Sequence, residues 1–346
     1  MKRIFINGKF LCQKITGVQR FAIEITKKMD ELIDETVEFF IVLPSKEYVV
    51  SDINYKHINK IYLKGKPNYY WEQVTLAKYC KKNHPDDLVN LCNIAPVLYP
   101  GSCVIHDLAW IDAKKGFSFK FRFVYKLITR LNIKKYKNIF TVSNTMKTRL
   151  KNYYKINDVS VVYNSADHIK GLVETKPKHE LPTNFYFSLG SINPNKNFKS
   201  IVRLASENPN LVFVISGKKH KAFANEKKLN IPNVIYTGYL DDKELVYMYK
   251  HCSGFLFPSN YEGFGIPPLE AMACNCQNII CNDIPVLREL FEKYVVFVDF
   301  NSIQDLSFLN NKSNNNNYTE ILEKYNWERS AKIIFDKIVI KNELDK

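Results

Sequence analysis

Residues 254–273 read GFLFPSNYEGFGIPPLEAMA. The apolar start predicts a buried strand, and the two prolines followed by LEAMA predict that a helix begins directly after the loop. The glycines on either side of Phe264 allow the loop to bring backbone N–H groups close to a ligand. Ligands of open α/β sheets bind beyond the carboxyl ends of strands, and a helix N-terminus attracts anions. We therefore expect this turn to bind a phosphate.

Two acidic residues flank the turn. Glu262 lies in the loop and Glu270 in the first turn of the predicted helix. Carboxylates on both sides of a phosphate-binding turn suit recognition of the hydroxyl groups of a sugar and of a ribose. A plainer interpretation stays open from these residues alone, in which Glu270 complements the helix dipole and Glu262 is a solvated loop acid.

The rest of the chain repeats this alternation of short apolar runs and helical patterns. Apolar runs that predict strands lie at residues 4–6, 39–43, 88–91, 103–106, 139–142 and 159–163, and again at 185–190, 211–217, 234–236, 254–258, 278–281 and 295–298. Strands separated by helices indicate parallel βαβ units around buried sheets, so the fold class is α/β. A length of 346 residues favours two domains, and the aperiodic stretch 168–184, with its two prolines, is the expected linker.

Composition narrows the function classes. The chain is 46% hydrophobic, which excludes a disordered protein, and it carries a formal net charge of +15. Of its 50 basic residues only 8 are arginine, so the charge argues little for nucleic-acid binding, which relies on arginine. None of the eight cysteines forms a C-x-x-C pair, so we expect reduced thiols and no metal site. We see no signal peptide and no apolar run of ~18 residues, and expect a cytoplasmic protein.

Three further strand ends carry candidate residues. The turn from Gly190 to Asn197 contains Lys196, which is placed to reach a phosphate, although a surface lysine is the plainer interpretation. Gly17, at a predicted helix start, allows the backbone to approach a diphosphate. His106 ends a strand and precedes an acid, which suits either an active site or a hydrogen-bonded structural role.

In their order and spacing these motifs resemble the retaining, nucleotide-sugar-dependent glycosyltransferases of family 4, which have the GT-B fold. The resemblance runs nearly end to end, and its most specific part is the block from Glu262 to Glu270. The supporting stretches are residues 7–8, 17–21, 70–73, 93–96, 106–108, 141–143, 162–164, 190, 196–197 and 238–240. The chain departs from the usual pattern at Ser191, where many members have arginine, and at Asn275 and Gln277, where many have glycine and proline.

The resemblance implies an architecture. Two Rossmann-like domains would form the active site in the cleft between them, with residues 1–168 binding the acceptor and residues 169–325 binding the nucleotide sugar. A C-terminal helix within 326–346 would cross back onto the first domain, and the apolar stripe of residues 327–341 fits that role. No metal would be required, because Lys196 and helix dipoles would neutralise the leaving group.

The resemblance also implies roles for single residues. The catalytic residues would be His106 near the reacting carbon, Glu262 on the transferred sugar and Lys196 on the donor diphosphate. Glu270 would bind the ribose hydroxyls, and Tyr239 and Leu240 would border the base. The other donor-binding positions would be Gly17 and Gly190 with Ser191 at the phosphates, and the backbone of Gly263, Phe264 and Gly265 at the sugar.

The basic charge is concentrated between residues 114 and 137, which hold nine basic residues and no acid. Aromatic residues at positions 117, 119, 121, 123 and 125 alternate with them, a period of two that is typical of strands, whereas the family implies a helix. Basic and aromatic side chains together suit the surface of an anionic membrane, and a solvated helix with core aromatics is the alternative. Our hypothesis is that this segment makes a peripheral contact with the inner face of the cytoplasmic membrane.

The resemblance therefore implies a retaining glycosyltransferase that moves a hexose-type sugar from a UDP-, GDP- or dTDP-linked donor. The acceptor would be a glycan or a polyprenyl-diphosphate-linked intermediate of a bacterial capsule or O-antigen. Two alternatives are weighed against it: a nucleotide-sugar epimerase of the same fold, and a non-catalytic nucleic-acid-binding protein that rests on charge alone.

Overall fold

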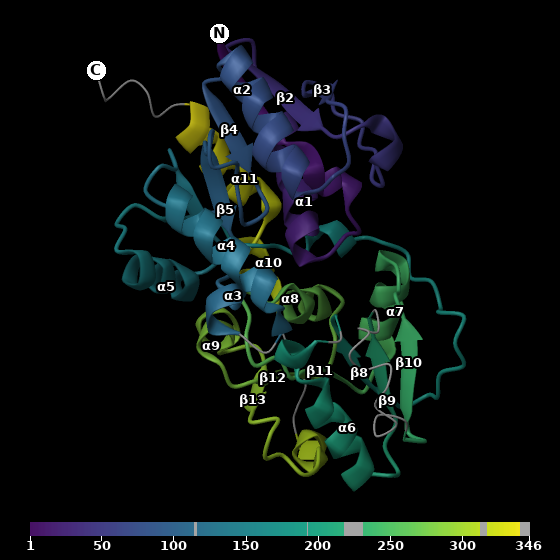
Figure 1. The fold of residues 1–346 in the computed structure, drawn as a ribbon. Coiled ribbons are helices and arrows are strands. Elements are labelled where there is room, and N and C mark those ends of the chain that lie inside the picture. The colour runs from purple at the N-terminus through teal and green to yellow at the C-terminus, as the bar shows by residue number, and fades with distance from the viewer. Residues whose placement is uncertain (114–115, 192, 218–230, 312–316, 340–346) are drawn as a thin grey trace. The chain divides into compact units, whose positions relative to one another are not determined.

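The computed structural model describes residues 1–113, 116–191, 193–217, 231–311 and 317–339. It divides into two units, of which the first comprises Met1–Asn164 with Asn326–Lys346 and the second Ser165–Tyr325 (Figure 1). Each unit is built on one parallel sheet, so the α/β class with two Rossmann-like domains is confirmed. The division predicted at residue 168 falls within the short 3-10 helix η5, Asp167–Ile169, at the start of the second unit.

The sheet of the first unit has seven strands in the order β3-β2-β1-β4-β5-β6-β7. The strands are β1 Lys2–Asn7, β2 Val37–Leu43, β3 Asn59–Tyr62, β4 Asp87–Asn90, β5 Ser102–Ile105, β6 Ile139–Thr141 and β7 Ser160–Val161. Strand β3 was not predicted, because it lies at the sheet edge and its residues NKIY are not buried, so it lacks the apolar run that marks the central strands. From β1 the sheet continues through β2 and β3 on one side, and β4 and the later strands lie on the other side. The topological switch point therefore lies between β1 and β4.

The helices of the first unit cover this sheet. They are η1 Gly8–Cys12, α1 Gly17–Asp30, η2 Lys46–Tyr48, the π-helix η3 Trp71–Leu76, α2 Ala77–Asn83, α3 Ala109–Asp112, α4 Phe119–Asn132, α5 Asn144–Tyr154 and α11 Trp327–Val339. The last of these comes from the end of the chain and packs beside α1 (Figure 1). Its Phe335 ring stacks on Phe39 with centroids 5.6 Å apart, and its Trp327 ring lies edge-on to Phe21 at 5.9 Å. The predicted return of the C-terminal helix to the first domain is therefore confirmed.

Helix α4 resolves the conflict between the period-2 pattern and the helix that the family implies. The segment is helical from Phe119, and the side chain of Ser118 caps it by accepting the N–H of Phe121. Phe121 and Tyr125, one turn apart, stack at 4.1 Å on the inner side, while Phe119 and Phe123 point outward. The alternation thus arises from two aromatic rows at i, i+4 spacing on opposite sides of one helix.

The sheet of the second unit has six strands in the order β10-β9-β8-β11-β12-β13. They are β8 Tyr186–Leu189, β9 Phe213–Ser216, β10 Val234–Gly238, β11 Gly254–Phe257, β12 Ile279–Asn282 and β13 Val296–Val298. The accompanying helices are η6 Pro194–Lys196, α6 Phe198–Glu207, α7 Asp242–His251, α8 Ile266–Ala273, α9 Pro285–Phe291, η9 Ser307–Asn311 and α10 Thr319–Lys324. Here the switch point lies between β8 and β11, and it is the place where a ligand of such a sheet is expected.

The eight cysteines are all free thiols, and all except Cys92 are buried. Among the described helices, none is long and apolar enough to cross a membrane.

Candidate active site

The two residues predicted to hold the donor diphosphate and its sugar meet at the switch point of the second unit. Lys196 follows β8 and Glu262 follows β11, and the Lys196 ammonium lies 2.5 Å from Oε1 of Glu262. Both side chains remain accessible, with 23% of Lys196 and 12% of Glu262 exposed. Lys196 is therefore not a solvated surface lysine and Glu262 is not a solvated loop acid.

The loop that carries Lys196 is held by its own asparagines. Asn193 caps η6 by accepting the N–H of Asn195 at 2.9 Å, and Asn197 ends it in the left-handed conformation at φ 52°. The N–H of Asn260 donates to the carbonyl of Asn195 at 2.9 Å, which ties the loop after β8 to the loop after β11. The ion pair between Lys196 and Glu262 thus joins two loops that the backbone already holds together.

A glycine that was not predicted shapes the same place. Gly217 follows β9 at φ +143°, and a Cβ there would lie 1.8 Å from the carbonyl oxygen of Gly190. A Cβ on Gly190, the predicted position, would instead find ordinary contacts at 3.5–3.6 Å with Phe198 and the Lys196 stem. The close approach of these two backbone segments therefore requires glycine at position 217. Ser191, another predicted position, is exposed, and its hydroxyl accepts a hydrogen bond from the side-chain amide of Asn193 at 3.0 Å.

The loop from Glu262 into α8 is anchored by Phe264. This ring is buried between Phe291, at 6.0 Å, and Tyr325, at 5.5 Å, so only its backbone can meet a ligand. Gly265 has φ 108°, and a Cβ there would lie 2.8 Å from the Leu287 side chain. The pattern predicted an anion site at the helix start, but Pro267 and Pro268 remove two of the N–H groups that the first turn would offer. Gly263, Phe264, Gly265 and Ile266 directly precede these two prolines.

Glu270 occupies a separate polar site on α8. The residue is 7% exposed, with Oε1 2.9 Å from Nε2 of His168 and Oε2 2.8 Å from the hydroxyl of Tyr249, which donates to it. Glu270 lies beyond the first turn of α8, so its predicted place in that turn was wrong, and it is held by two side chains rather than by the helix dipole. Neither partner was predicted: His168 lies in the expected linker, Tyr249 reads as a core residue of α7, and they are separated from Glu270 by 102 and 21 residues.

The remaining predicted donor residues of this unit lie after β10, on the far side of β9 from Lys196. Tyr239 is 52% exposed, whereas Leu240 is 4% exposed, directly before the Asp241 cap of α7. Only Tyr239 is thus accessible for a ligand, and Leu240 belongs to the core.

Gly17 and His106, the other predicted residues, belong to the first unit. Gly17 is exposed as the first residue of α1. His106 follows β5 and is buried, with Nε2 donating to the carbonyl of Leu91 at 2.8 Å and the Phe21 ring edge-on at 4.8 Å. Burial lowers the pKa of His106 to about 4, and the hydrogen bond to Leu91 offsets this only in part. The imidazole is therefore neutral at pH 7, with its proton on Nε2.

Replacing His106 with glutamine should change how stability depends on pH. In the wild type the unfolded chain binds a proton at His106 near pH 6.5, while the folded chain binds it only near pH 4. Acidification through this window therefore lowers the free energy of unfolding by up to about 3 kcal/mol through this residue. Urea unfolding at pH 7 and pH 4.5 should show a smaller loss on acidification in His106→Gln than in the wild type. Equal losses would contradict the buried neutral state.

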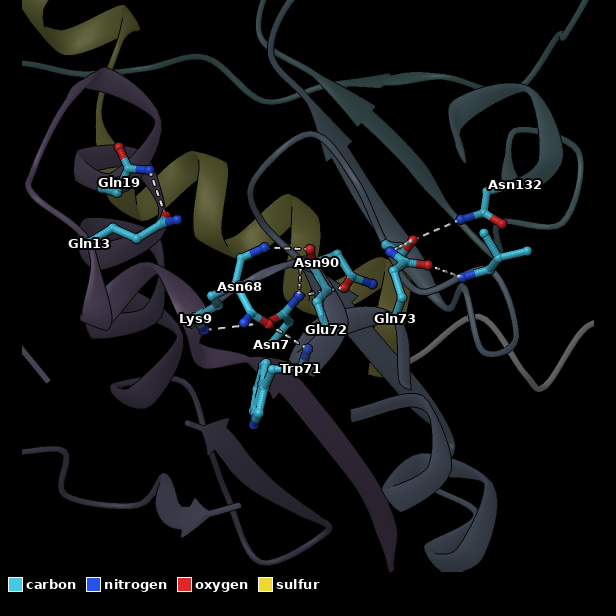
Figure 2. A network of polar contacts seen from close by, with 12 residues as sticks. Asn7, Lys9, Gln13, Gln19, Asn68, Trp71, Glu72, Gln73, Asn90 and Asn132 are labelled. Atoms are coloured by element: carbon cyan, nitrogen blue, oxygen red, sulfur yellow. Dashed lines mark hydrogen bonds and ion pairs between the residues drawn. The ribbon is translucent and has the colours of Figure 1, made fainter. Parts of the chain in front are cut away.

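A buried polar network lies at the switch point of the first unit, at the ends of β1 and β4, and was not predicted (Figure 2). Asn7 donates to Oε1 of Glu72 at 2.8 Å and to Oδ1 of Asn90 at 3.1 Å. Lys9 forms an ion pair with Oε2 of Glu72, which is 2% exposed. Glu72 comes from the π-helix η3, and such helices occur frequently at functional sites.

Comparison with known proteins agrees with this architecture. Residues 173–326 match the family model "Glycosyl transferases group 1". The O-antigen chain mannosyltransferase RfbU of Salmonella typhimurium is 27% identical over 59% of this chain and 58% of its own length. The serotype-specific mannosyltransferase WbdA of Escherichia coli is 27% identical over 68% of this chain and 32% of its own length. The chain thus spans less than two thirds of the length of these relatives.

Among solved structures, HepE of Anabaena, crystallised in complex with UDP and glucose, superimposes with a TM-score of 0.62. The match covers 97% of this chain and 95% of HepE at 17% sequence identity, so it shows a shared fold. The two-unit fold, the family match and these relatives are consistent with one another. Residues 173–326 thus resemble the glycosyl transferases group 1 family, and the chain as a whole shares its two-domain fold with HepE.

Proposed function

We propose that this protein is a retaining glycosyltransferase that moves a hexose from a nucleotide-diphosphate sugar to an acceptor during assembly of a bacterial surface polysaccharide. The observation that carries the proposal is the ion pair of Lys196 and Glu262 at the switch point between β8 and β11. A cation that meets a carboxylate there, both partly exposed, matches a donor whose diphosphate and sugar are adjacent. The sugar transfer would take place in the cytoplasm.

The roles of the residues follow from their charges. Lys196 would leave Glu262 in part and neutralise the departing diphosphate, helped by the N–H groups of the Gly263–Gly265 loop. Glu262, released from its partner, would accept hydrogen bonds from sugar hydroxyls. Glu270 would accept hydrogen bonds from the ribose hydroxyls, since a carboxylate has lone pairs beyond those used by His168 and Tyr249. We propose that these groups suffice without a metal ion.

The donor and acceptor classes rest on the relatives. RfbU and WbdA are named mannosyltransferases, so nucleotide-linked mannose is the first donor to test. HepE holds UDP and glucose, which makes UDP-glucose the second. The acceptor would be a glycan or a polyprenyl-diphosphate-linked intermediate, because RfbU is named for the O-antigen chain.

A thermal-shift panel of nucleoside diphosphates and their sugars tests the donor site, because selective binding to the folded state raises the melting temperature. The donor that stabilises most is then incubated with and without a lipid-linked acceptor, and the products are analysed by NMR for anomeric configuration. Transfer with retention supports the proposal. Conversion of the donor sugar without acceptor would favour the epimerase, and absence of stabilisation by every nucleotide would contradict the proposal.

Tyr249→Phe tests the ribose site. Removing a hydroxyl that hydrogen-bonds a carboxylate leaves Glu270 less well oriented, and bonds of this kind contribute enough to change affinity about tenfold. We expect the KM for the donor to rise by about that factor with little change in kcat, since ribose binding is common to ground and transition states. Tyr247→Phe, on the outer side of α7, is the matched control and should leave the KM unchanged. An unaltered KM in both variants would remove Glu270 from the donor site.

A further inference from the structure

Helix α4 exposes a row of large apolar side chains. Phe119, Phe123, Leu127 and Leu131 are 78%, 58%, 45% and 43% exposed and follow one another at i, i+4 spacing. The opposite side of the helix is occupied by Phe121, Tyr125 and Ile128, which pack in the core or against it. The row is therefore not needed to hold the helix to its unit, and an exposed apolar row of this kind indicates an interaction site.

Cations border this row on the same exposed side. Lys120, Lys126 and Arg130 are exposed, and none of the three forms an ion pair with any residue that the structure describes. We call these seven residues the α4 ridge; they are Phe119, Lys120, Phe123, Lys126, Leu127, Arg130 and Leu131. Arg122 is not part of it, because its Nε donates to the carbonyl of Trp110 at 3.1 Å. The predicted Lys114 and Lys115 lie outside the described residues.

The stretch of sequence that contains the ridge carries charge of one sign. No acidic residue occurs between Asp112 and Asp158 in the sequence, although basic residues recur throughout that stretch. Arg149 pairs with Asp112, so one of the flanking acids is already engaged. A partner for the ridge must therefore accept apolar side chains and supply negative charge along the same face.

Three kinds of partner can be compared on this basis. A second copy of the ridge would bring like charges together. A nucleic acid supplies negative charge, but its phosphate backbone gives the four apolar side chains no burial. An anionic lipid surface supplies both, because the rings and leucines enter the region below the headgroups while the cations meet lipid phosphates. We propose that the α4 ridge docks this protein on the surface of an anionic phospholipid bilayer, with the axis of α4 parallel to it.

Flotation of the full chain with lipid vesicles tests the ridge without any donor or acceptor. The wild type should bind vesicles made of equal parts phosphatidylcholine and phosphatidylglycerol far better than vesicles of phosphatidylcholine alone. The triple variant Lys120→Gln, Lys126→Gln, Arg130→Gln should lose about fivefold in partition for each charge removed. The double variant Phe119→Ser, Phe123→Ser should lose roughly tenfold for each ring.

The matched control removes three lysines from a different helix of the same unit. Lys78, Lys81 and Lys82 are exposed on α2, and their replacement by glutamine changes the net charge equally. This control should retain most of the binding, and all variants should melt as the wild type does because only exposed positions change.

Three outcomes would overturn the proposal. The first is equal binding to neutral and anionic vesicles, and the second is a control that loses as much binding as the triple variant. The third is binding of the wild type to a random DNA duplex, reduced by the ridge variants, without binding to vesicles. None of these outcomes depends on sugar transfer, because flotation uses neither donor nor acceptor. A failure of the docking proposal can therefore be told apart from a failure of the proposed activity.

Discussion

Replacing Lys196 with alanine is expected to lower kcat by two to three orders of magnitude. Removing a preformed group that stabilises developing charge in an active site costs about 10²–10³ in kcat. Here the loss would be compounded, because the Glu262 carboxylate, 12% exposed and paired with Lys196 at 2.5 Å, would face the diphosphate without its cation. The Glu262 carboxylate and the diphosphate would then repel each other at a position where the proposed mechanism needs a positive charge.

Lys196→Arg separates charge from geometry. Arginine keeps the positive charge, but its planar fork does not fit a position shaped for a point charge, so we expect intermediate activity. Lys243→Ala, an exposed lysine of α7 in the same unit, is the control for the loss of one charge. Initial rates at saturating donor, measured for all three variants, check the prediction. Turnover of Lys196→Ala within about twofold of the control would refute its role at the diphosphate.

The sequence predicted the strands well because each central strand of a parallel sheet is buried on both faces and appears as a short apolar run. The exception, β3, lies at the edge and has no such run. Helix α4 shows the reverse difficulty. Its two aromatic rows produce a period of two in the sequence, whereas the capped helical backbone of the structure shows that the segment is a helix.

The candidate site could be predicted where function depends on local pattern and not where it depends on distant pairing. Lys196 and Glu262 each follow a strand in the sequence, so the topology of the sheet places both at one edge. Their ion pair, and the contact of His168 with Glu270, join residues 66 and 102 positions apart, and no local pattern marks such pairs. Glycine 217 was visible only as the end of a strand, because its requirement comes from the backbone of Gly190.

Glu72→Ala is expected to destabilise the first unit by about 3–5 kcal/mol, the cost of removing one member of a buried ion pair. Glu72 is 2% exposed, and both of its oxygens are used, by Asn7 at 2.8 Å and by Lys9 (Figure 2). Alanine would leave the Lys9 ammonium, in a side chain 11% exposed, with the Tyr69 ring at 5.3 Å as its remaining partner among the described residues. The free energy of unfolding in urea measures the loss, and Glu72→Gln should retain the bond to Asn7 and lose less.

A double-mutant cycle decides what that loss represents. If the pair stabilises mainly by compensating its own desolvation, Lys9→Met in the Glu72→Ala background should restore part of the stability, because no charge then remains buried without a partner. If the pair adds net stability, the double variant should remain well below the wild type in its free energy of unfolding. We expect the first result, since Lys9 and Glu72 are both largely removed from water, where desolvation offsets most of the attraction between charges. The role of this network at the switch point would then be to hold Asn7 and Asn90 in place at the ends of β1 and β4.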